Sequence, residues 1–308
     1  MGLSVRLLQG GDEEKLDTFL VPHTPFVYFM RSNAKNGGLS YAGKVYQAEY
    51  FGAFNDEALV GVLTHSWLGN VQVFVEDNKH VEALVAAWLD SYRKNPREVL
   101  GFLGEPAQMK ILFSVLNISP ALLRRGGHGE MLFSLSLNKI AIPPLLGRKD
   151  ITARRAQSQD LEALSVWRHD YNVEAVNAPP GQETYDKGRA EILRRIDEGD
   201  LFVLEKQGQL VSFCGVGGFL PDWKCVGPVW TPPDLRSLGY ARAVTAAALL
   251  TMREEGATHA VLFTDTPQAE KVCRAIGFER IGDFLLDFPM KPLLSFDAHP
   301  DVSETLCK

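Results

Sequence analysis

The first half of the chain alternates apolar blocks of strand-like spacing with segments whose apolar residues recur every three or four positions. Two short turn-forming runs, 55–57 and 69–70, separate the first three strands that this pattern predicts. The expected elements are a helix at 12–19, strands at 48–55, 59–68 and 71–75, a helix at 79–93, a strand at 99–103, a helix at 106–116 and a closing strand at 131–141.

The second half repeats this order of strands and helices. Its expected elements are a strand at 151–155, helices at 160–170 and 185–198, strands at 201–206, 210–220 and 225–230, a helix at 241–255, a strand at 259–265, a helix at 269–276 and a strand at 281–288. The repetition indicates an internal duplication of an α/β fold of the α+β type. We therefore predict two domains, 1–147 and 148–292. The C-terminal tail, 293–308, shows no periodicity, and we expect it to be loosely held.

The most informative segment is a strand, a turn and a helix that begins at Val226. The apolar run ends at a double proline, the turn reads Arg-x-x-Gly-x-Ala from Arg236 to Ala241, and a helical pattern follows. Backbone N–H groups in the first turn of a helix have no partner inside the helix, and the helix dipole adds positive potential there. The turn glycine, Gly239, lets a ligand approach the backbone closely. The expected ligand is therefore a phosphate or pyrophosphate.

Three motifs of this half resemble, in order and spacing, those of the GNAT superfamily of acetyl-CoA-dependent N-acyltransferases. The segment from Val229 to Ala241 is similar to the family's Val-x-x-Pro-x-x-Arg-x-x-Gly-x-Ala turn, and the other two motifs are the strand 262–265 and the run from Ala269 to Phe278. The overall layout is similar to tandem GNAT proteins whose first half is a degenerate copy. The resemblance implies tandem GNAT folds, each a mixed, mostly antiparallel central sheet flanked by helices.

The resemblance also implies the co-substrate, acetyl-CoA, and direct transfer of its acetyl group to an amine. The pyrophosphate would lie on the backbone amides of the turn, and the pantetheine arm would pair with the strand before it. Strands 225–230 and 259–265 would splay apart to admit the thioester, whose carbonyl the strand backbone can polarise. The implied cofactor-binding residues are Val229, Trp230, Thr231, Arg236, Ser237, Leu238, Gly239, Tyr240, Ala241, Arg242 and Thr266.

The proton-transfer groups depart from the family pattern. Cys273 stands where the family commonly has the tyrosine that protonates the leaving thiolate, and Asp222 precedes the strand near which such folds place a carboxylate. We take Asp222 and Cys273 as the candidate catalytic residues, against the simpler interpretations of a turn aspartate and a buried packing cysteine. Asp265, Glu174 and His169 are further candidates for the base, with helix capping or solvent exposure as their simpler interpretations.

The first half has no comparable turn. Glu76 and Asp77 follow its strand 71–75 and would repel a pyrophosphate there. We therefore expect that this half binds no acetyl-CoA and serves as scaffold and as one wall of the acceptor pocket.

Composition narrows the class of protein. The chain has 308 residues, 45% of them hydrophobic and 23% charged, and the net charge of −6 arises in residues 151–308. We see no basic patch, no apolar run of membrane-spanning length and no signal peptide, so we expect no nucleic acid, no membrane partner and a cytoplasmic location. The four cysteines show no CxxC spacing, which argues against a metal site and against a disulfide framework.

Two functions from different classes remain open at this point. The first is an acetyl-CoA-dependent N-acetyltransferase, an acyltransferase whose acceptor we expect to be a small-molecule amine, and a homodimer is compatible with it. The alternative is a non-catalytic acyl-CoA-binding or sensing protein, which the missing tyrosine favours.

Overall fold

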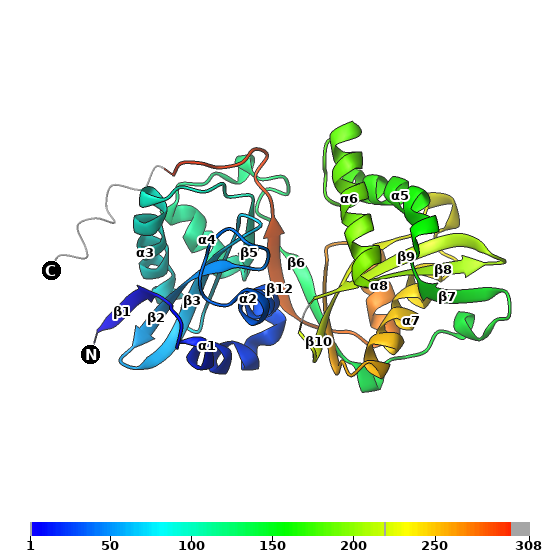
Figure 1. Ribbon diagram of the computed structural model, residues 1–308, viewed down its shortest axis with the longest axis horizontal. Coiled ribbons are helices and arrows are strands. Elements are labelled where there is room, and N and C mark those ends of the chain that lie inside the picture. The colour runs from blue at the N-terminus through cyan, green and yellow to red at the C-terminus, as the bar shows by residue number, and fades with distance from the viewer. Residues whose placement is uncertain (1, 219, 297–308) are drawn as a thin grey trace. The chain divides into compact units, whose positions relative to one another are not determined.

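The computed structural model describes residues 2–218 and 220–296, which form two compact units (Figure 1). The first unit contains the described residues up to Glu130 together with those from Asp283 onward, and the second contains Met131–Gly282. Each unit is built around a mixed sheet with helices packed against both faces.

The sheet of the first unit has the strand order β1-β2-β3-β4-β5-β12. Strands β4 and β5 are parallel, and the other neighbours pair antiparallel. The strands are β1 (Leu3–Leu7), β2 (Ala48–Asn55), β3 (Ala58–Ser66), β4 (Asn70–Val75), β5 (Gly101–Gly104) and β12 (Glu279–Asp287).

Four helices cover the two faces of this sheet. Helices α1 (Glu13–Leu20) and α2 (Thr24–Gly37) share one apolar core with it, and α3 (Val81–Lys94) and α4 (Pro106–Val115) share another. The buried residues of α3 recur at helical spacing, which is why the sequence pattern predicts this helix within two residues at its N-terminus and one at its C-terminus.

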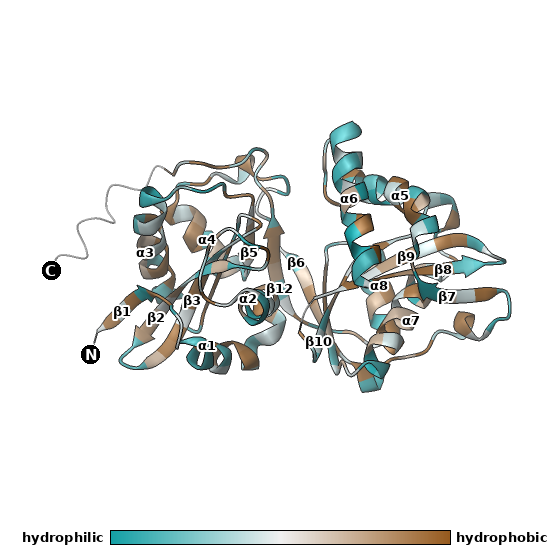
Figure 2. Cartoon of the chain, in the orientation of Figure 1, coloured by the Kyte–Doolittle hydropathy of each residue, from teal (hydrophilic) through white to brown (hydrophobic). Residues whose placement is uncertain are grey.

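The sheet of the second unit has the order β6-β11-β10-β9-β8-β7, with β10 and β11 parallel. Its strands are β6 (Glu130–Ser136), β7 (Ile151–Arg155), β8 (Leu201–Lys206), β9 (Gln209–Gly217), β10 (Trp223–Trp230) and β11 (His259–Thr264). Helices α5 (Leu161–Ala175) and α6 (Gln182–Glu198) pack on one face, and α7 (Tyr240–Glu254) and α8 (Pro267–Ile276) pack on the other. Figure 2 shows that α6 is largely hydrophilic along its length, and its fully buried side chain is Ile192.

The predicted fold class, with two mixed and mostly antiparallel sheets flanked by helices, is confirmed. The compact units nevertheless divide the chain at other residues than 147 and 292. The strand expected at 131–141 to close the first half ends at Ser136 and is β6, which pairs antiparallel with β11 over six residues. The last strand, β12, pairs through Leu285–Asp287 with β5 of the first unit. Each strand is placed by a long-range backbone ladder, which the local hydrophobic pattern does not specify.

The first residues of the predicted loose tail are held in place. Leu293 forms a bridge with Val99, and the ring of Phe296 lies 5.5 Å from that of Trp88 and 5.2 Å from that of Tyr92. Residues 297–308 of this predicted tail lie outside the described residues.

Candidate functional site

Strands β10 and β11 are hydrogen-bonded to each other only at their beginnings. Their parallel pairing joins Trp223–Cys225 to His259–Val261, whereas β10 continues to Trp230 and β11 to Thr264. The C-terminal parts of the two strands are therefore open toward each other, as the sequence led us to expect.

Strand β10 also changes register with its other neighbour. Val226 lies opposite Val216 and Val229 lies opposite Cys214, so β10 contains one extra residue between these pairs. This bulge contains Gly227 and begins two residues after Cys225, the last residue that pairs with β11. The register of β10 with β9 thus changes close to the point where its pairing with β11 ends, and Val229 and Trp230 pair with β9 again beyond the bulge.

The turn after β10 presents a row of unpaired backbone N–H groups. Among the described residues, no N–H from Ser237 to Arg242 has a hydrogen-bond partner, and the first N–H of α7 that has one belongs to Ala243. Gly239 has a φ of 83°, and a Cβ built on it would meet no heavy atom closer than 4.0 Å. The left-handed backbone explains the glycine, and the space above it is open. Unpaired N–H groups at the start of a 15-residue helix are suited to bind an anion.

Arg242 adds positive charge beside these groups. Its Nη2 atom is the nearest atom to the Cβ position of Gly239, so the guanidinium lies alongside the turn. Its Nε is buried without a hydrogen-bond partner, and Arg242 forms no ion pair with any described residue. A guanidinium without an anionic partner at this place is suited to a phosphate.

Arg236, in contrast, is already engaged. Its Nε donates to the carbonyl of Thr231 at 3.0 Å, and Nη1 and Nη2 lie 2.9 and 3.0 Å from the two carboxylate oxygens of Glu174 on α5. The guanidinium also lies 4.7 Å from the centre of the Trp230 ring. The side chain expected at the pyrophosphate therefore connects the turn to α5 in this structure.

Most other predicted cofactor residues offer only their backbone to a ligand. Trp230 and Thr231 are buried, and the hydroxyl of Thr231 lies 2.9 Å from that of Ser212. Leu238 is exposed, and the Thr266 hydroxyl accepts a hydrogen bond from Ala269 N as the cap of α8.

The two candidate catalytic residues lie in different surroundings. The Asp222 carbonyl accepts hydrogen bonds from Thr258 N and His259 N, which places this residue at the paired end of β10 and β11, opposite to their open end. Cys273 is buried on α8, and burial raises the pKa of its thiol to about 12. At neutral pH this thiol holds its proton, which excludes a nucleophilic thiolate but also makes the group a weaker acid than an ordinary cysteine.

The further candidates for a base do not converge on one point. Glu174 is paired with Arg236, Asp265 is exposed between β11 and α8, and Nε2 of His169 lies 3.4 Å from the Gly181 N–H at the start of α6. The three side chains therefore lie in different surroundings, and the structure does not single out one of them as the base.

The sequence reasoning missed a buried ionic network beside the bulge. Arg168 and Arg195 both bind Glu191, and Arg195 also binds Asp200 and the carbonyl of Gly227. One signal was present in the sequence: strand β9 carries glycines at positions 215 and 217, where strands ordinarily carry side chains.

The first unit fills the corresponding places with its own side chains. Gln108, on α4 and 1% exposed, accepts from Val75 N at 3.0 Å and donates to Val75 O at 2.9 Å, just beyond the parallel pairing of β4 with β5. At the start of the next helical segment, Asp77 accepts from Lys79 N at 3.1 Å.

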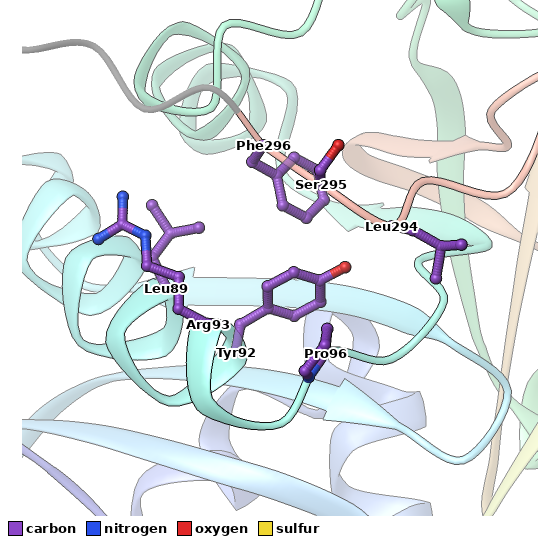
Figure 3. Close-up of a pocket in the computed structure, with 7 residues that line it drawn as sticks. All are labelled: Leu89, Tyr92, Arg93, Pro96, Leu294, Ser295 and Phe296. Atoms are coloured by element: carbon purple, nitrogen blue, oxygen red, sulfur yellow. The ribbon is translucent and has the colours of Figure 1, made fainter.

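A hollow of about 230 Å³ lies elsewhere in the first unit, between α3 and the segment that follows β12 (Figure 3). Tyr92 and Arg93 line it from α3, and Leu294 and Phe296 line it from the other side. None of its lining residues belongs to a parallel strand pair or to the turn before α7, so we do not connect it with the anion site.

The described residues contain neither a cluster of metal ligands nor a membrane-spanning helix. No group of three or more histidine, cysteine, aspartate or glutamate side chains is arranged to hold a metal ion among residues 2–218 and 220–296. Within the same ranges, no helix has both the length and the apolar character needed to cross a membrane.

Comparison with known proteins agrees with this geometry. Residues 161–278 match the model of the acetyltransferase (GNAT) family. The sequence matches no curated protein at a significant level. Among solved structures, a Drosophila protein is similar at 14% identity and a TM-score of 0.62, with 94% of this chain and 99% of that chain covered.

Two further structures resemble this one over nearly the whole length of both chains. A GCN5-related N-acetyltransferase from Sphaerobacter thermophilus has 12% identity and a TM-score of 0.57, covering 96% of this chain and 98% of its own. A tandem GNAT protein from the clavulanic acid biosynthesis pathway has 13% identity and a TM-score of 0.52, covering 93% and 98%. At these identities the likeness establishes the tandem fold.

Proposed function

We propose that this chain transfers an acetyl group from acetyl-CoA to a small-molecule amine. The premise of this proposal is the GNAT acetyltransferase family, whose model matches residues 161–278. The second unit alone would bind the cofactor. The observation that carries the proposal is the open row of N–H groups from Ser237 to Arg242, beside an unpaired guanidinium and at the mouth of two diverging strands.

Each part of this site has a role in the proposal. The N–H groups and Arg242 would hold the pyrophosphate, and Arg236 would join them if its carboxylate partner gives way. The edge of Val229–Thr231 that faces away from β9, where β11 no longer pairs with β10, would pair with the amides of the pantetheine arm.

The chemistry needs little more than placement. The amine nitrogen attacks the thioester carbon, the C–N bond forms, and the C–S bond breaks to release the thiol. Proximity in the bound complex and N–H groups aimed at the carbonyl oxygen together supply a large share of such a rate. We propose that Cys273 protonates the leaving thiolate and that the proton lost by the amine nitrogen passes through water to restore the Cys273 thiol. Asp222 would take the amine proton only if the acceptor reaches the paired end of the strands.

The proposed class of acceptor is inferred from the net charge of the second half of the chain. Residues 151–308 carry 17 basic and 23 acidic side chains, which favours a cationic amine over an anionic acceptor.

One observation favours the alternative, an acyl-CoA-binding or sensing protein without turnover. The position of the family's proton-donating tyrosine holds Cys273, which is 7% exposed and belongs to the apolar core. Tight binding of acetyl-CoA without thiol release, in the presence of a broad set of primary amines, would support this second function.

Calorimetric titration with acetyl-CoA tests the proposal directly. We expect one site per chain, lost in Gly239→Glu because the new carboxylate would stand among the anion-binding N–H groups. Gly208→Glu is the matched control, since Gly208 also has positive φ (77°) and open space around it but lies in the turn between β8 and β9. Two sites per chain would contradict the division of roles between the units, and an unaffected Gly239→Glu would contradict the cradle.

A further inference from the structure

Arg195 of α6 lies across strand β9 and contacts the bulge in β10. Its Nη2 donates to the Gly227 carbonyl at 3.2 Å, its Nη1 donates to Asp200 Oδ2 at 3.2 Å, and its Nε donates to Glu191 Oε1 at 3.1 Å. All three contacts are directional hydrogen bonds from one planar guanidinium. The position of the side chain is therefore fixed at each of its nitrogen atoms.

The charges that hold Arg195 are themselves shielded from water. The side chains of Arg195, Asp200 and Glu191 are 13%, 17% and 26% exposed, and the second oxygen of Glu191 accepts two hydrogen bonds from Arg168. Two guanidinium groups and two carboxylates balance in charge. Taking four charges out of water is costly, so burial of this kind is poorly explained by stability alone.

Strand β9 is shaped to accommodate this guanidinium. A Cβ on Gly215 would lie 2.7 Å from Arg195 Nη1 and 2.8 Å from the Gly227 carbonyl oxygen, and a Cβ on Gly217 would lie 3.1 Å from Asp200 Oδ2. Any side chain at residue 215 would therefore separate Arg195 from the bulge. Because neither glycine has a side chain, the guanidinium can lie directly against the backbone of β9.

The bulge lies within two residues of Cys225, where the pairing of β10 with β11 ends. We infer that Arg195 is a positioning residue, which fixes the Gly227 carbonyl and thereby the course of the β10 backbone along which the acyl arm of the cofactor would lie. This inference rests on the proposed function. It assigns Arg195 to the acyl arm and not to the pyrophosphate, which the turn before α7 would hold by separate groups.

The protonation of the network agrees with this role. Burial raises the pKa of Asp200 even though Arg195 opposes that shift. Burial would also raise the pKa of Glu191, but the guanidinium groups of Arg168 and Arg195 lower it below its usual value. Arg195 thus keeps a charged partner in Glu191 at neutral pH.

Differential binding tests the inference without knowledge of the acceptor. The two probes are acetyl-CoA and 3′-phosphoadenosine 5′-diphosphate, which is the nucleotide part of the cofactor without the pantetheine arm. For Arg195→Gln in the full chain, we expect the dissociation constant of acetyl-CoA to rise about tenfold or more while that of the nucleotide stays unchanged. Arg195→Lys, which keeps the charge but not the three-way geometry, should recover part of the loss.

Two further variants protect this test against loss of folding. Gly215→Ala keeps every charge and displaces Arg195 from the bulge, so it should show the same selective loss. Arg194→Gln is the matched control, because the neighbouring Arg194 is paired with Glu198 on the surface of the same helix and should affect neither probe.

The outcomes separate this inference from the proposed function. Equal loss of both probes, or loss of neither, in Arg195→Gln and Gly215→Ala overturns the inference and leaves the cofactor site standing. If the wild-type protein binds the nucleotide but gains nothing from the pantetheine arm, the inference is likewise overturned. If the wild-type protein binds neither probe, the proposed function fails and the inference falls with it.

Discussion

The parallel strand pairs of the two units, β4–β5 and β10–β11, occupy the same place in the order of elements. They differ in what hydrogen-bonds to the backbone beyond the paired residues. In the first unit the carboxamide of Gln108 satisfies both the N–H and the C=O of Val75, directly beyond the paired residues. Gln108 is the third residue of α4, and the third residue of α8 in the second unit is Ala269, which has no polar side chain. The same architecture is thus closed by its own side chain in one unit and left open in the other.

The helix starts that follow β4 and β10 differ in the same way. Asp77 provides a carboxylate to the backbone N–H of Lys79 and also pairs with its ammonium group at 2.6 Å. The turn before α7 offers no such group, and its N–H groups from Ser237 to Arg242 remain unpaired among the described residues. The first unit therefore supplies its own anion where the second leaves room for an external one.

This difference is what we expect if the first unit binds no acetyl-CoA. Buried polar groups must be satisfied, so a fold that no longer binds a ligand gains stability by supplying the ligand's hydrogen bonds itself. The absence of a glycine turn is only one mark of this change in the first unit. The second mark is a side chain that pairs with the backbone as a ligand amide would.

The largest effect should follow from removing the amide that closes the first unit. Gln108→Leu leaves the Val75 N–H and C=O buried without partners, which we expect to lower the free energy of unfolding by about 2–3 kcal/mol. Urea denaturation of the full chain measures this loss. The exposed Gln9 provides the control, since Gln9→Leu should change the unfolding midpoint little. Equal midpoints for the two variants would mean that Gln108 stabilises nothing.

A smaller effect should follow from placing the same amide in the second unit. Ala269→Gln introduces a carboxamide at the matching position of α8, where it could bind the free backbone of β10. We expect the affinity for acetyl-CoA to fall about 30-fold, equivalent to about 2 kcal/mol, because the pantetheine arm would then compete with this side chain. Calorimetric titration gives the dissociation constant.

The control for Ala269→Gln separates the effect of a new hydrogen bond from the effect of a larger side chain. Ala269→Leu adds a side chain of similar size without hydrogen-bonding groups, and it should weaken binding less. Thr266 caps α8, and a glutamine three residues after a threonine cap can instead bind the N–H of that cap. Unchanged affinity in Ala269→Gln would show that the amide prefers this local bond, and the comparison of the two units would then fail at this position.

The sequence predicted most of the elements that this comparison involves, but not the side-chain contacts that explain the difference between the units. Strong local patterns placed α3, α7 and the central strands, and the Arg-x-x-Gly-x-Ala motif indicated the anion site at Gly239. The prediction missed β1 and α2, although Leu3, Val5 and Leu7 of the short β1 alternate with polar residues. The pairing of β6 with β11 was missed because long-range ladders are set by the whole fold.

The site was predicted least well where one residue acts on another far away in the chain. No spacing rule connects Gln108 with Val75, or Arg195 with Gly227, since these contacts depend on how a helix lies on a sheet. Arg236 illustrates the same limit: its place in the motif is as predicted, but Glu174 of α5, 62 residues earlier, holds its guanidinium. The functional prediction for Asp222 and Cys273 stays open for this reason.

The smallest of these effects should come from the guanidinium beside the turn. Arg242→Gln removes a charge that has no ion-pair partner among the described residues, so little stability should be lost, while the affinity for acetyl-CoA should fall about tenfold. Because this contribution is partly electrostatic, the difference between wild type and variant should shrink as salt rises. Arg253→Gln, eleven residues further along the same helix, should leave the affinity unchanged, since about 16 Å of helix separates it from the turn. If instead both variants bind equally well at every salt concentration, the backbone N–H groups alone hold the anion, and the positive charge that distinguishes the second unit from the first plays no part in binding.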